Sequence, residues 1–304
     1  MFPTKILLAT DGSEEAVHAA GTAVALASKT DSELHIVYVE PLPDPYALPE
    51  TSIHHPEMRE EIRAMARRSA KEKLASEKDR VSEMGEVAGA HARIGRPDAE
   101  ISHLAEELGA GLTVVGSRGL GFVRRTLLGS VSYSVVHHAH NPVLVVRDGQ
   151  DTLPDKILAA VDGSRESSLA LRTAAELSEK TGAEVHVAYV LPTPAQMYGP
   201  HFYSPDMKDR LLDQANEKAN AFLEEQAGQV EAAGGRVGGT HLASGRAESE
   251  VVRLAGRLGA GLTVVGSRGL GGVRRALLGS VSDAVVRHAH NPVLVVRENE
   301  THDG

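Results

Sequence analysis

The chain has 304 residues, of which 41% are hydrophobic and 24% are charged, and its formal net charge at pH 7 is −9. This balance is typical of a globular protein with room for two domains of ordinary size. The acidic balance argues against broad binding to nucleic acid or to an anionic membrane, because both require a basic surface. The lack of cysteine excludes disulfides, thiol nucleophiles and cysteine-ligated zinc. No apolar run approaches the roughly 18 residues of a membrane span, and the apolar run at the N-terminus is too short for a signal peptide. We therefore expect a cytoplasmic location.

The chain contains an internal repeat with a period of about 150 residues. KILLATDGS from Lys5 matches KILAAVDGS from Lys156, and residues 108–147 match residues 258–297. A period of this length indicates a duplicated domain rather than a solenoid repeat. We expect one domain at residues 1–148 and a second at 149–304, joined by a polar stretch at 148–155. The pairs that differ between the two long matching segments are Phe122/Gly272, Thr126/Ala276, Tyr133/Asp283, Ser134/Ala284 and His137/Arg287.

Each half alternates short apolar runs with segments of helical periodicity. In the first half, strands are predicted at Lys5–Thr10, Glu33–Val39, Val87–Ile94, Leu112–Val115 and Val143–Val146. Helices are predicted at Glu14–Thr30, Pro56–Gly85, Pro97–Leu108 and Ser130–Ala139. The second half repeats this order, so we expect an α/β fold of two tandem, doubly wound, Rossmann-like parallel sheets with helices on both faces. Such sheets bind ligands at the carboxyl ends of their strands, where the strand order reverses.

The longest helix of each half carries apolar residues at helical spacing, which predicts one apolar stripe along it. In the first half the stripe consists of Ile62, Met65, Ala66, Ala70, Leu74, Val81 and Met84. In the second half it consists of Met207, Leu211, Leu212, Ala215, Ala219, Phe222, Leu223 and Val230.

A glycine loop follows the fourth predicted strand of each half. Its small residues are Gly116, Gly119, Gly129 and Ser130 in the first copy, and Gly266, Gly269, Gly279 and Ser280 in the second. Glycines let the backbone approach a ligand, and a helix that begins after Gly129 offers free N–H groups to an anion. The alternative is a tight connection in which Ser130 caps the helix. Phosphate binding is favoured, and nearby basic residues would neutralise phosphate oxygens: Arg124, Arg125, Arg274 and Arg275.

Two better-known nucleotide motifs are missing from the sequence. The chain has no G-x-x-x-x-G-K-[ST] segment, and Gly119-Leu-Gly121 lacks the third glycine of a dinucleotide fingerprint. Asp11 and Asp162 instead end the first strand of each half, opposite the glycine loop. Such a carboxylate suits ribose hydroxyls or a metal on the phosphates, and it equally suits an Asp-Gly turn in which Ser13 or Ser164 caps the next helix.

The pattern G-x2-G-x9-G-S, which follows T-V-V and ends in N-P-V-L-V-V, resembles the ATP-binding class of the universal stress protein family. The resemblance extends over nearly the whole chain, twice. It implies an adenine nucleotide alpha hydrolase-like sheet of strand order 3-2-1-4-5 and ATP as the ligand, with or without Mg or Mn. The contacts that it implies are Asp11 and Asp162 to the ribose, the Val39 and Val190 backbones to adenine, and Gly116, Gly119, Gly129, Ser130, Val131, Gly266, Gly269, Gly279, Ser280 and Val281 to the phosphates. Arg118 and Arg268, inside the motif, complete the predicted site.

Members of this family dimerise through the last strand, here Val143–Val146 and Val293–Val296. A tandem chain is similar to such a dimer fused covalently, so we expect its halves to pair through these strands and a homodimer to form in addition. The Pro-rich loops at 40–55 and 191–205 leave the ligand end of the sheet. Their aromatic residues suit lids or partner contacts, and a variable surface loop is the alternative: Tyr46, Tyr198, Phe202 and Tyr203.

Three classes of function are compatible with this sequence. The favoured one is a nucleotide-binding regulatory module of the stress response, and the others are a slow ATPase and an interaction scaffold with empty sites. No nucleophile–base pair stands near the loop, so we assign no catalytic residue. The histidines before each Asn-Pro lie near a helix C-terminus, where the helix dipole favours them, and we predict no metal site: His137, His138, His140, His288 and His290.

Overall fold

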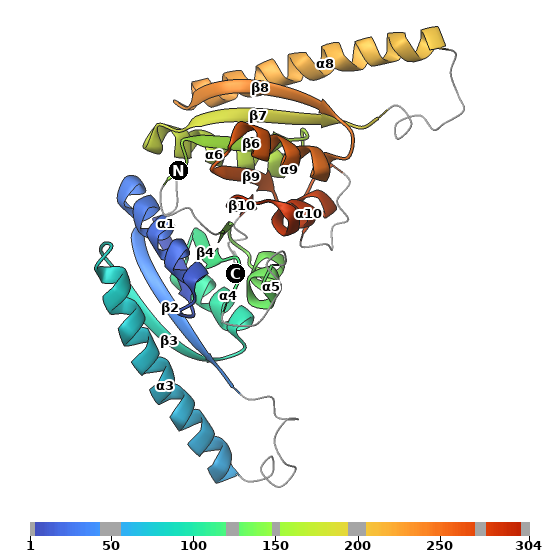
Figure 1. Ribbon diagram of the computed structural model, residues 1–304. Coiled ribbons are helices and arrows are strands. Elements are labelled where there is room, and N and C mark those ends of the chain that lie inside the picture. The colour runs from blue at the N-terminus through green and yellow to red at the C-terminus, as the bar shows by residue number, and fades with distance from the viewer. Residues whose placement is uncertain are drawn as a thin grey trace, which may run out of the picture. The chain divides into compact units, whose positions relative to one another are not determined.

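The computed structural model describes residues 4–42, 56–119, 128–147, 153–193, 205–270 and 278–298. They form two compact units, with residues 4–147 in one and residues 153–298 in the other (Figure 1). Several residues of interest to the sequence analysis lie outside the described part: the linker at 148–152, the four loop arginines, Phe122 and Gly272, and the aromatic residues of the Pro-rich loops.

Both units contain the same succession of strands and helices. In the first unit the elements are β1 (Lys5–Thr10), α1 (Glu14–Thr30), β2 (Glu33–Pro41), α3 (Pro56–Ser82), β3 (Gly89–Gly95), α4 (Pro97–Leu108), β4 (Leu112–Gly116), α5 (Ser130–His138) and β5 (Val143–Val146). In the second they are β6 (Lys156–Val161), α6 (Arg165–Thr181), β7 (Glu184–Leu191), α8 (Pro205–Ala232), β8 (Arg236–Ser244), α9 (Ala247–Leu258), β9 (Leu262–Gly266), α10 (Ser280–His288) and β10 (Val293–Val296).

The expected elements of the first half are all present, with small shifts at their ends. β2 runs two residues further than predicted, to Pro41, and α3 ends at Ser82 instead of Gly85. Gly85 closes the turn after α3, since its N–H donates to the carbonyl of Val81 at 3.1 Å. The next strand therefore begins at Gly89 rather than at Val87.

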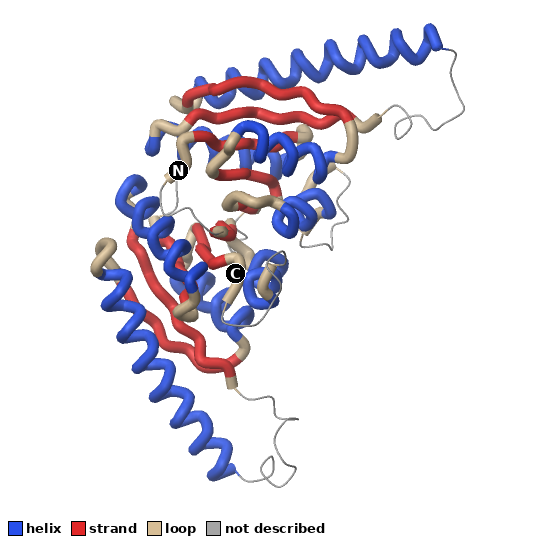
Figure 2. The backbone as a smooth tube through the Cα atoms, viewed as in Figure 1, coloured by secondary structure: helices blue, strands red, loops and turns tan. Residues whose placement is uncertain are grey.

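The strands of each unit are parallel, and their order confirms the predicted 3-2-1-4-5 arrangement. It reads β3-β2-β1-β4-β5 in the first unit and β8-β7-β6-β9-β10 in the second. In the first unit α1 and α3 cover one face of the sheet, and α4 and α5 cover the other (Figure 2). The order reverses between β1 and β4, so the carboxyl ends of these strands border the place where such sheets bind ligands.

The central strands are apolar on both faces, as strands covered by helices on each side must be. Ile6, Leu7 and Leu8 of β1 are all fully buried, and Val143–Val146 is buried along its whole length. A polar side chain joins β4 to β5: Asn141 donates from Nδ2 to the carbonyl of Ala110 at 2.9 Å and to Oγ1 of Thr113 at 3.0 Å. Asn291 repeats both bonds in the second unit, which explains the Asn-Pro before each last strand.

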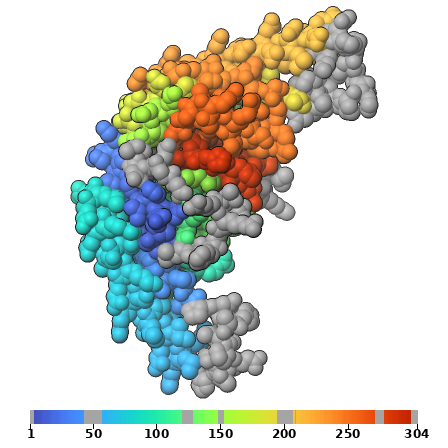
Figure 3. All heavy atoms as spheres, in the orientation of Figure 1, coloured from blue at the N-terminus to red at the C-terminus, as the bar shows by residue number. Residues whose placement is uncertain are grey.

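The long helices bury only part of their apolar stripes. In α3, Ala70, Leu74 and Val81 are buried against the sheet, whereas Met65 is 72% exposed. The first turns of α3 extend past the end of the neighbouring strands (Figure 1), and they form part of the open surface (Figure 3). α8 behaves in the same way, because Ala219, Leu223 and Val230 are buried and Met207 is exposed. Each predicted apolar stripe is therefore buried only beyond the first turns of its helix.

Across the described ranges, no helix combines the length and the apolar character needed to cross a membrane.

Candidate functional site

Each unit has a cavity at the carboxyl end of its central strands. The cavity of the first unit has a volume of about 370 Å³ and is bordered by the ends of β1, β2 and β4. Its equivalent in the second unit measures about 440 Å³. Volumes of this size are typical of small-molecule sites. Apart from the four loop arginines, which lie outside the described residues, the predicted nucleotide-contact residues lie on a cavity wall. They are Asp11, Val39, Gly116, Arg118, Gly119, Gly129, Ser130 and Val131 on the first, and Asp162, Val190, Gly266, Arg268, Gly269, Gly279, Ser280 and Val281 on the second.

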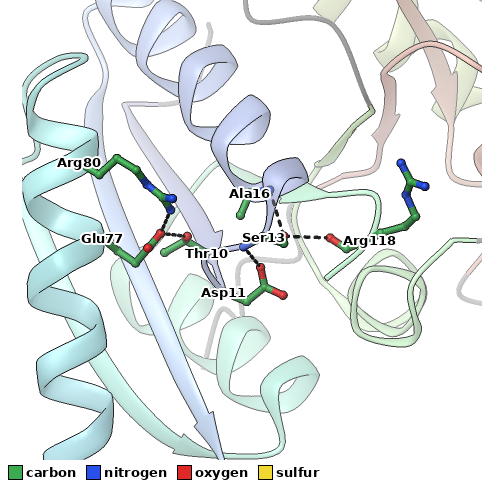
Figure 4. A network of polar contacts seen from close by, with 7 residues as sticks. All are labelled: Thr10, Asp11, Ser13, Ala16, Glu77, Arg80 and Arg118. Atoms are coloured by element: carbon green, nitrogen blue, oxygen red, sulfur yellow. Dashed lines mark hydrogen bonds and ion pairs between the residues drawn. The ribbon is translucent and has the colours of Figure 1, made fainter. Parts of the chain in front are cut away.

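One carboxylate oxygen of Asp11 holds the turn between β1 and α1. Its Oδ1 accepts a hydrogen bond from the backbone N–H of Ser13 at 3.0 Å, and the Ser13 hydroxyl accepts from the N–H of Ala16 at 3.2 Å (Figure 4). Ser13 is thus the N-cap of α1. Gly12 between them has φ 85°, a left-handed conformation that favours glycine. The turn-and-cap interpretation of Asp-Gly-Ser is therefore correct, and Asp162-Gly-Ser repeats it.

The other carboxylate oxygen of each aspartate faces the glycine loop. A Cβ on Gly119 would fall on Oδ2 of Asp11, and a Cβ on Gly269 would fall on Oδ2 of Asp162. In the second unit this oxygen also accepts a hydrogen bond from the N–H of Leu270 at 3.1 Å. The turn thus occupies one oxygen and points the other toward the cavity, so the structural role of the aspartate and a ligand contact are compatible.

The first and third motif glycines have packing reasons within the protein itself. A Cβ on Gly116 would lie 2.9 Å from the carbonyl carbon of Glu15, so glycine lets the first turn of α1 approach β4. A Cβ on Gly129 would lie 3.3 Å from Cα of Arg118, and the Gly129 N–H donates to the carbonyl of Ser117 at 2.8 Å. The two described ends of the loop therefore lie next to each other beside the cavity.

The N-terminus of α5 opens onto the cavity. The helix begins at Ser130, and no side chain caps it. The N–H groups of its first turn have no partner within the helix, and the helix dipole adds positive potential there. Ser132 fixes this end, because its hydroxyl donates to the carbonyl of Gly116 at 2.6 Å. With Ser130 and Val131 on the cavity wall, this end of α5 suits an anion such as a phosphate.

The two arginines of the motif pair with carboxylates in the first turns of α1 and α6. Arg118 Nη2 lies 2.7 Å from Oε1 of Glu15, and Arg268 Nη2 lies 3.1 Å from Oε1 of Glu166. Each cation is therefore partly neutralised at the cavity wall. Burial, together with the positive charge of Arg268, lowers the pKa of Arg297 to about 10.

Polar residues of α3 border the first site, and the sequence analysis did not identify them. Glu77 is buried, and its Oε2 accepts from the Thr10 hydroxyl and pairs with Arg80 (Figure 4). Its Oε1 lies 3.5 Å from the place that a Cβ on Gly12 would occupy, just behind the β1–α1 turn. The spacing of Glu77 from Ala70 and Leu74 puts it on the buried side of α3, which is the feature that could have identified it.

The histidines near the end of α5 contact other groups of the protein. His138 Nδ1 lies 2.8 Å from the carbonyl of Ser134 one turn earlier, and His140 Nε2 lies 3.6 Å from Oε1 of Glu106. Within the part of the chain that the structure describes, no three or more His, Cys, Asp or Glu side chains gather as a metal site requires.

Each of the two doubly wound α/β units thus arranges a helix N-terminus, a glycine loop and a carboxylate around one cavity, an arrangement that suits an anionic small molecule. The family model described as the universal stress protein family matches residues 3–147 and 154–297. The chain belongs to this family, as a tandem of two of its domains.

Relatives and solved structures agree with this assignment. A universal stress protein of Mycolicibacterium smegmatis is 33% identical over 193 residues, which are 62% of this chain and 62% of that protein. Another, of Mycobacterium tuberculosis, is 33% identical over 205 residues, 66% of this chain and 64% of that one. The matches thus span less than two thirds of these relatives. A universal stress protein structure from Archaeoglobus fulgidus has a TM-score of 0.68 at 24% identity, with 97% of both chains covered, and shows the same fold.

Proposed function

We propose that each unit binds one adenine nucleotide, ATP, in the cavity at the carboxyl end of its strands. The observation that carries this proposal is the convergence of the glycine loop, the α5 N-terminus and Oδ2 of Asp11 on one cavity. The second unit repeats it around Asp162.

The ligand orientation follows from the chemistry of the two ends of the cavity. Phosphates fit the N-terminus of α5 beside Ser130, because N–H donors and helix dipole both favour negative charge there. The ribose hydroxyls fit Oδ2 of Asp11, which is a charged acceptor. The base then lies at the end of β2, beside Val39, where the family resemblance puts adenine. Mg or Mn would enter with the phosphates, so binding should be measured with and without the metal.

The protein then acts as a regulatory module of the stress response in the cytoplasm. Asp11 is engaged in its turn, and no nucleophile–base pair of the kind that hydrolysis needs lines the described part of either cavity. Slow ATP hydrolysis and a nucleotide-free scaffold are the competing functions. We also propose a domain boundary at residues 148/149, pairing of the two halves through their last strands, and homodimer formation. Cysteine pairs placed in those strands of this cysteine-free chain would test the pairing by disulfide formation.

The first experiment is to denature the purified chain and identify the small molecules released by chromatography and mass spectrometry. The proposal expects about two adenine nucleotides per chain, or the same number of sites when Mg-ATP is titrated into nucleotide-free protein. A chain that releases no nucleotide and gives no calorimetric response to Mg-ATP would contradict it and favour the scaffold function.

A further inference from the structure

The two cavities have equivalent glycine loops and aspartates, but they differ in one wall, which β2 and α3 form in the first cavity. In the first cavity this charged wall consists of Tyr38, Glu40 and Lys73. Lys73 Nζ lies 2.9 Å from Oε2 and 3.1 Å from Oε1 of Glu40, and 5.5 Å from the centroid of the Tyr38 ring. The hydrogen bond that Lys73 donates to Glu40 raises the pKa of Lys73, so the ammonium stays charged. The wall therefore presents a fixed donor beside a fixed acceptor.

The second unit keeps the aromatic residue of this wall and loses the carboxylate. In the strand registers Tyr38 is opposite the last residue of β1, and Tyr189 is opposite the last residue of β6. The position two residues further is Glu40 in the first unit and Leu191 in the second. An acceptor at the end of β2 thus has an apolar counterpart at the end of β7.

The second unit also replaces the ammonium by an aromatic ring. Phe222 packs edge-on against Tyr189, with ring centroids 5.2 Å apart, as Lys73 lies over the ring of Tyr38. The buried positions of the two helices confirm that Phe222 is equivalent to Lys73. They have the same spacing in both helices: Ala70, Leu74, Glu77 and Val81 in α3, and Ala219, Leu223, Gln226 and Val230 in α8. Lys73 and Phe222 each directly precede the second of these positions.

The second cavity has different lining residues on the side where Phe222 replaces Lys73. Tyr189, Leu191 and Phe222 do not occur among the described residues that line it, whereas Val190 and Val251 line it as Val39 and Ile101 line the first cavity. The ring of Phe222 instead reaches the turn after β6, with its Cζ 3.9 Å from the place of a Cβ on Gly163. The first cavity can therefore form hydrogen bonds through Glu40 and Lys73, whereas no equivalent pair occurs among the described residues that line the second.

We propose that Glu40 and Lys73 determine which base the first cavity accepts, and that the second cavity lacks this selectivity. The inference rests on the proposed function, nucleotide binding in both cavities. Glu40 directly follows Val39, the expected neighbour of the base. Adenine carries an amine donor beside a ring-nitrogen acceptor, which complement a carboxylate and an ammonium. Hypoxanthine carries a carbonyl oxygen in place of the amine, so it would bring an acceptor toward the Glu40 carboxylate.

The expected selectivity is moderate. Sites that hydrogen-bond a polar group reject analogues far better than apolar sites do, because a mismatch leaves polar groups unpaired. The Lys73 side chain is 50% exposed and that of Glu40 is 18% exposed, so water compensates part of the mismatch. We therefore expect a preference for ATP over inosine triphosphate of about tenfold in the first cavity and near unity in the second.

The test measures each cavity separately in the full chain. Gly269→Ala places a methyl group on Asp162 and blocks the second cavity, and Gly119→Ala does the same to Asp11 and the first. Calorimetric titration of each single-site variant with ATP and with inosine triphosphate gives two dissociation constants. Their ratio, that for inosine triphosphate divided by that for ATP, measures the selectivity of the open cavity. The proposal expects a high ratio when the first cavity is open and a ratio near one when the second is open.

Substitutions of Glu40 and Lys73 then test whether these residues cause the selectivity of the first cavity. Glu40→Gln keeps the size and supplies an amide that can donate to the inosine carbonyl, so the ratio should fall severalfold. Glu40→Leu with Lys73→Phe copies the second unit and should lower the ratio to that of the second cavity. Glu60→Gln removes a carboxylate that pairs with Arg67 elsewhere on α3, at 2.8 Å, and should leave the ratio unchanged.

The reciprocal exchange, Leu191→Glu with Phe222→Lys, should raise the ratio of the second cavity. Equal ratios in the two open cavities, or a ratio that Glu40→Gln leaves unchanged while ATP still binds, would overturn the inference and leave nucleotide binding intact. If the unsubstituted chain binds no ATP at all, both the proposed function and this inference are overturned.

Discussion

Oδ2 of Asp11 and the Cα of Gly119 lie so close together that a methyl group on the glycine would fall on the carboxylate oxygen. Asp162 and Gly269 repeat this relationship in the second unit. The glycine therefore keeps open the side of the aspartate that faces the cavity, while the opposite oxygen holds the β1–α1 turn. This explains how a residue that is needed for folding can also contact a ligand.

The first prediction follows from this contact. Gly119→Ala and Gly269→Ala should each reduce the number of nucleotides bound per chain from about two to about one, because the methyl group displaces a carboxylate oxygen from its place in one cavity. Native mass spectrometry or equilibrium dialysis with ATP measures this number. Gly256→Ala is the matched control, since it adds its methyl group in open space on α9. Two nucleotides retained by both cavity variants would exclude the proposed ligand position.

The second prediction concerns the charge of the aspartate. Asp11→Asn keeps an oxygen for the Ser13 N–H but removes the charged acceptor, so the dissociation constant for ATP in the first cavity should rise by roughly 10- to 100-fold, the value of one charge-assisted hydrogen bond. The measurement uses the Gly269→Ala background, in which the first cavity alone is open. If any ATP hydrolysis is detected, its loss in Asp11→Asn with binding preserved would favour an enzyme. Unchanged affinity would show that Asp11 serves the turn alone.

The sequence predicted the parallel fold because its determinants are local. Short apolar runs such as Val143–Val146 must be buried on both faces, and duplication makes the period visible. The motif residues around the cavity were also predictable, since strand ends and helix starts bring Asp11 and Gly129 to the same edge of a parallel sheet. The family resemblance then supplied the strand order.

The contact of Lys73 on α3 with Glu40 depends on tertiary packing and was not predictable. Glu40 and Lys73 are 33 residues apart, and their contact depends on how α3 lies across β2. Helical periodicity also could not tell where the sheet ends beneath the helix. Met65 therefore continued the apolar stripe in the sequence although it lies beyond the buried part of α3.

The third prediction tests this division of α3. Leu74→Ala should lower the free energy of unfolding by about 2 to 5 kcal/mol, because it leaves a cavity against the sheet. Met65→Ala should change it by less than about 0.5 kcal/mol, because exposed positions contribute little to packing. Urea denaturation followed by circular dichroism compares the two in the same background. A comparable loss in Met65→Ala would mean that the first turns of α3 are covered in solution.

The fourth prediction concerns a histidine pair that both units carry on their outer strands. His35 Nδ1 lies 3.1 Å from His91 Nε2, and His186 Nδ1 lies 3.0 Å from His241 Nε2. Burial lowers the pKa values of His91, His186 and His241. Neighbouring positive charge lowers them further: His35 and Arg93 act on His91.

A histidine whose pKa is lower in the folded chain binds its proton more readily in the unfolded chain. As the pH falls below about 6.5, the unfolded state is protonated first, so the free energy of unfolding should decrease between that pH and the lowered pKa values. At higher pH the histidines are neutral in both states and contribute no pH dependence. The pairs should therefore make the fold less stable in mild acid, while the nearby Glu107 opposes the effect at His91.

Urea denaturation at pH 7.5 and pH 5.5 checks this sign. The loss of stability between the two pH values should be smaller in His91→Asn and His241→Asn than in the unsubstituted chain, because an amide does not titrate in this range. His103→Asn, an exposed position on α4, is the control and should keep the parental difference. An equal loss in all four proteins would assign the acid sensitivity to carboxylates instead. A larger loss in the pair variants would mean that a charged histidine stabilises the folded strands, the reverse of what burial predicts.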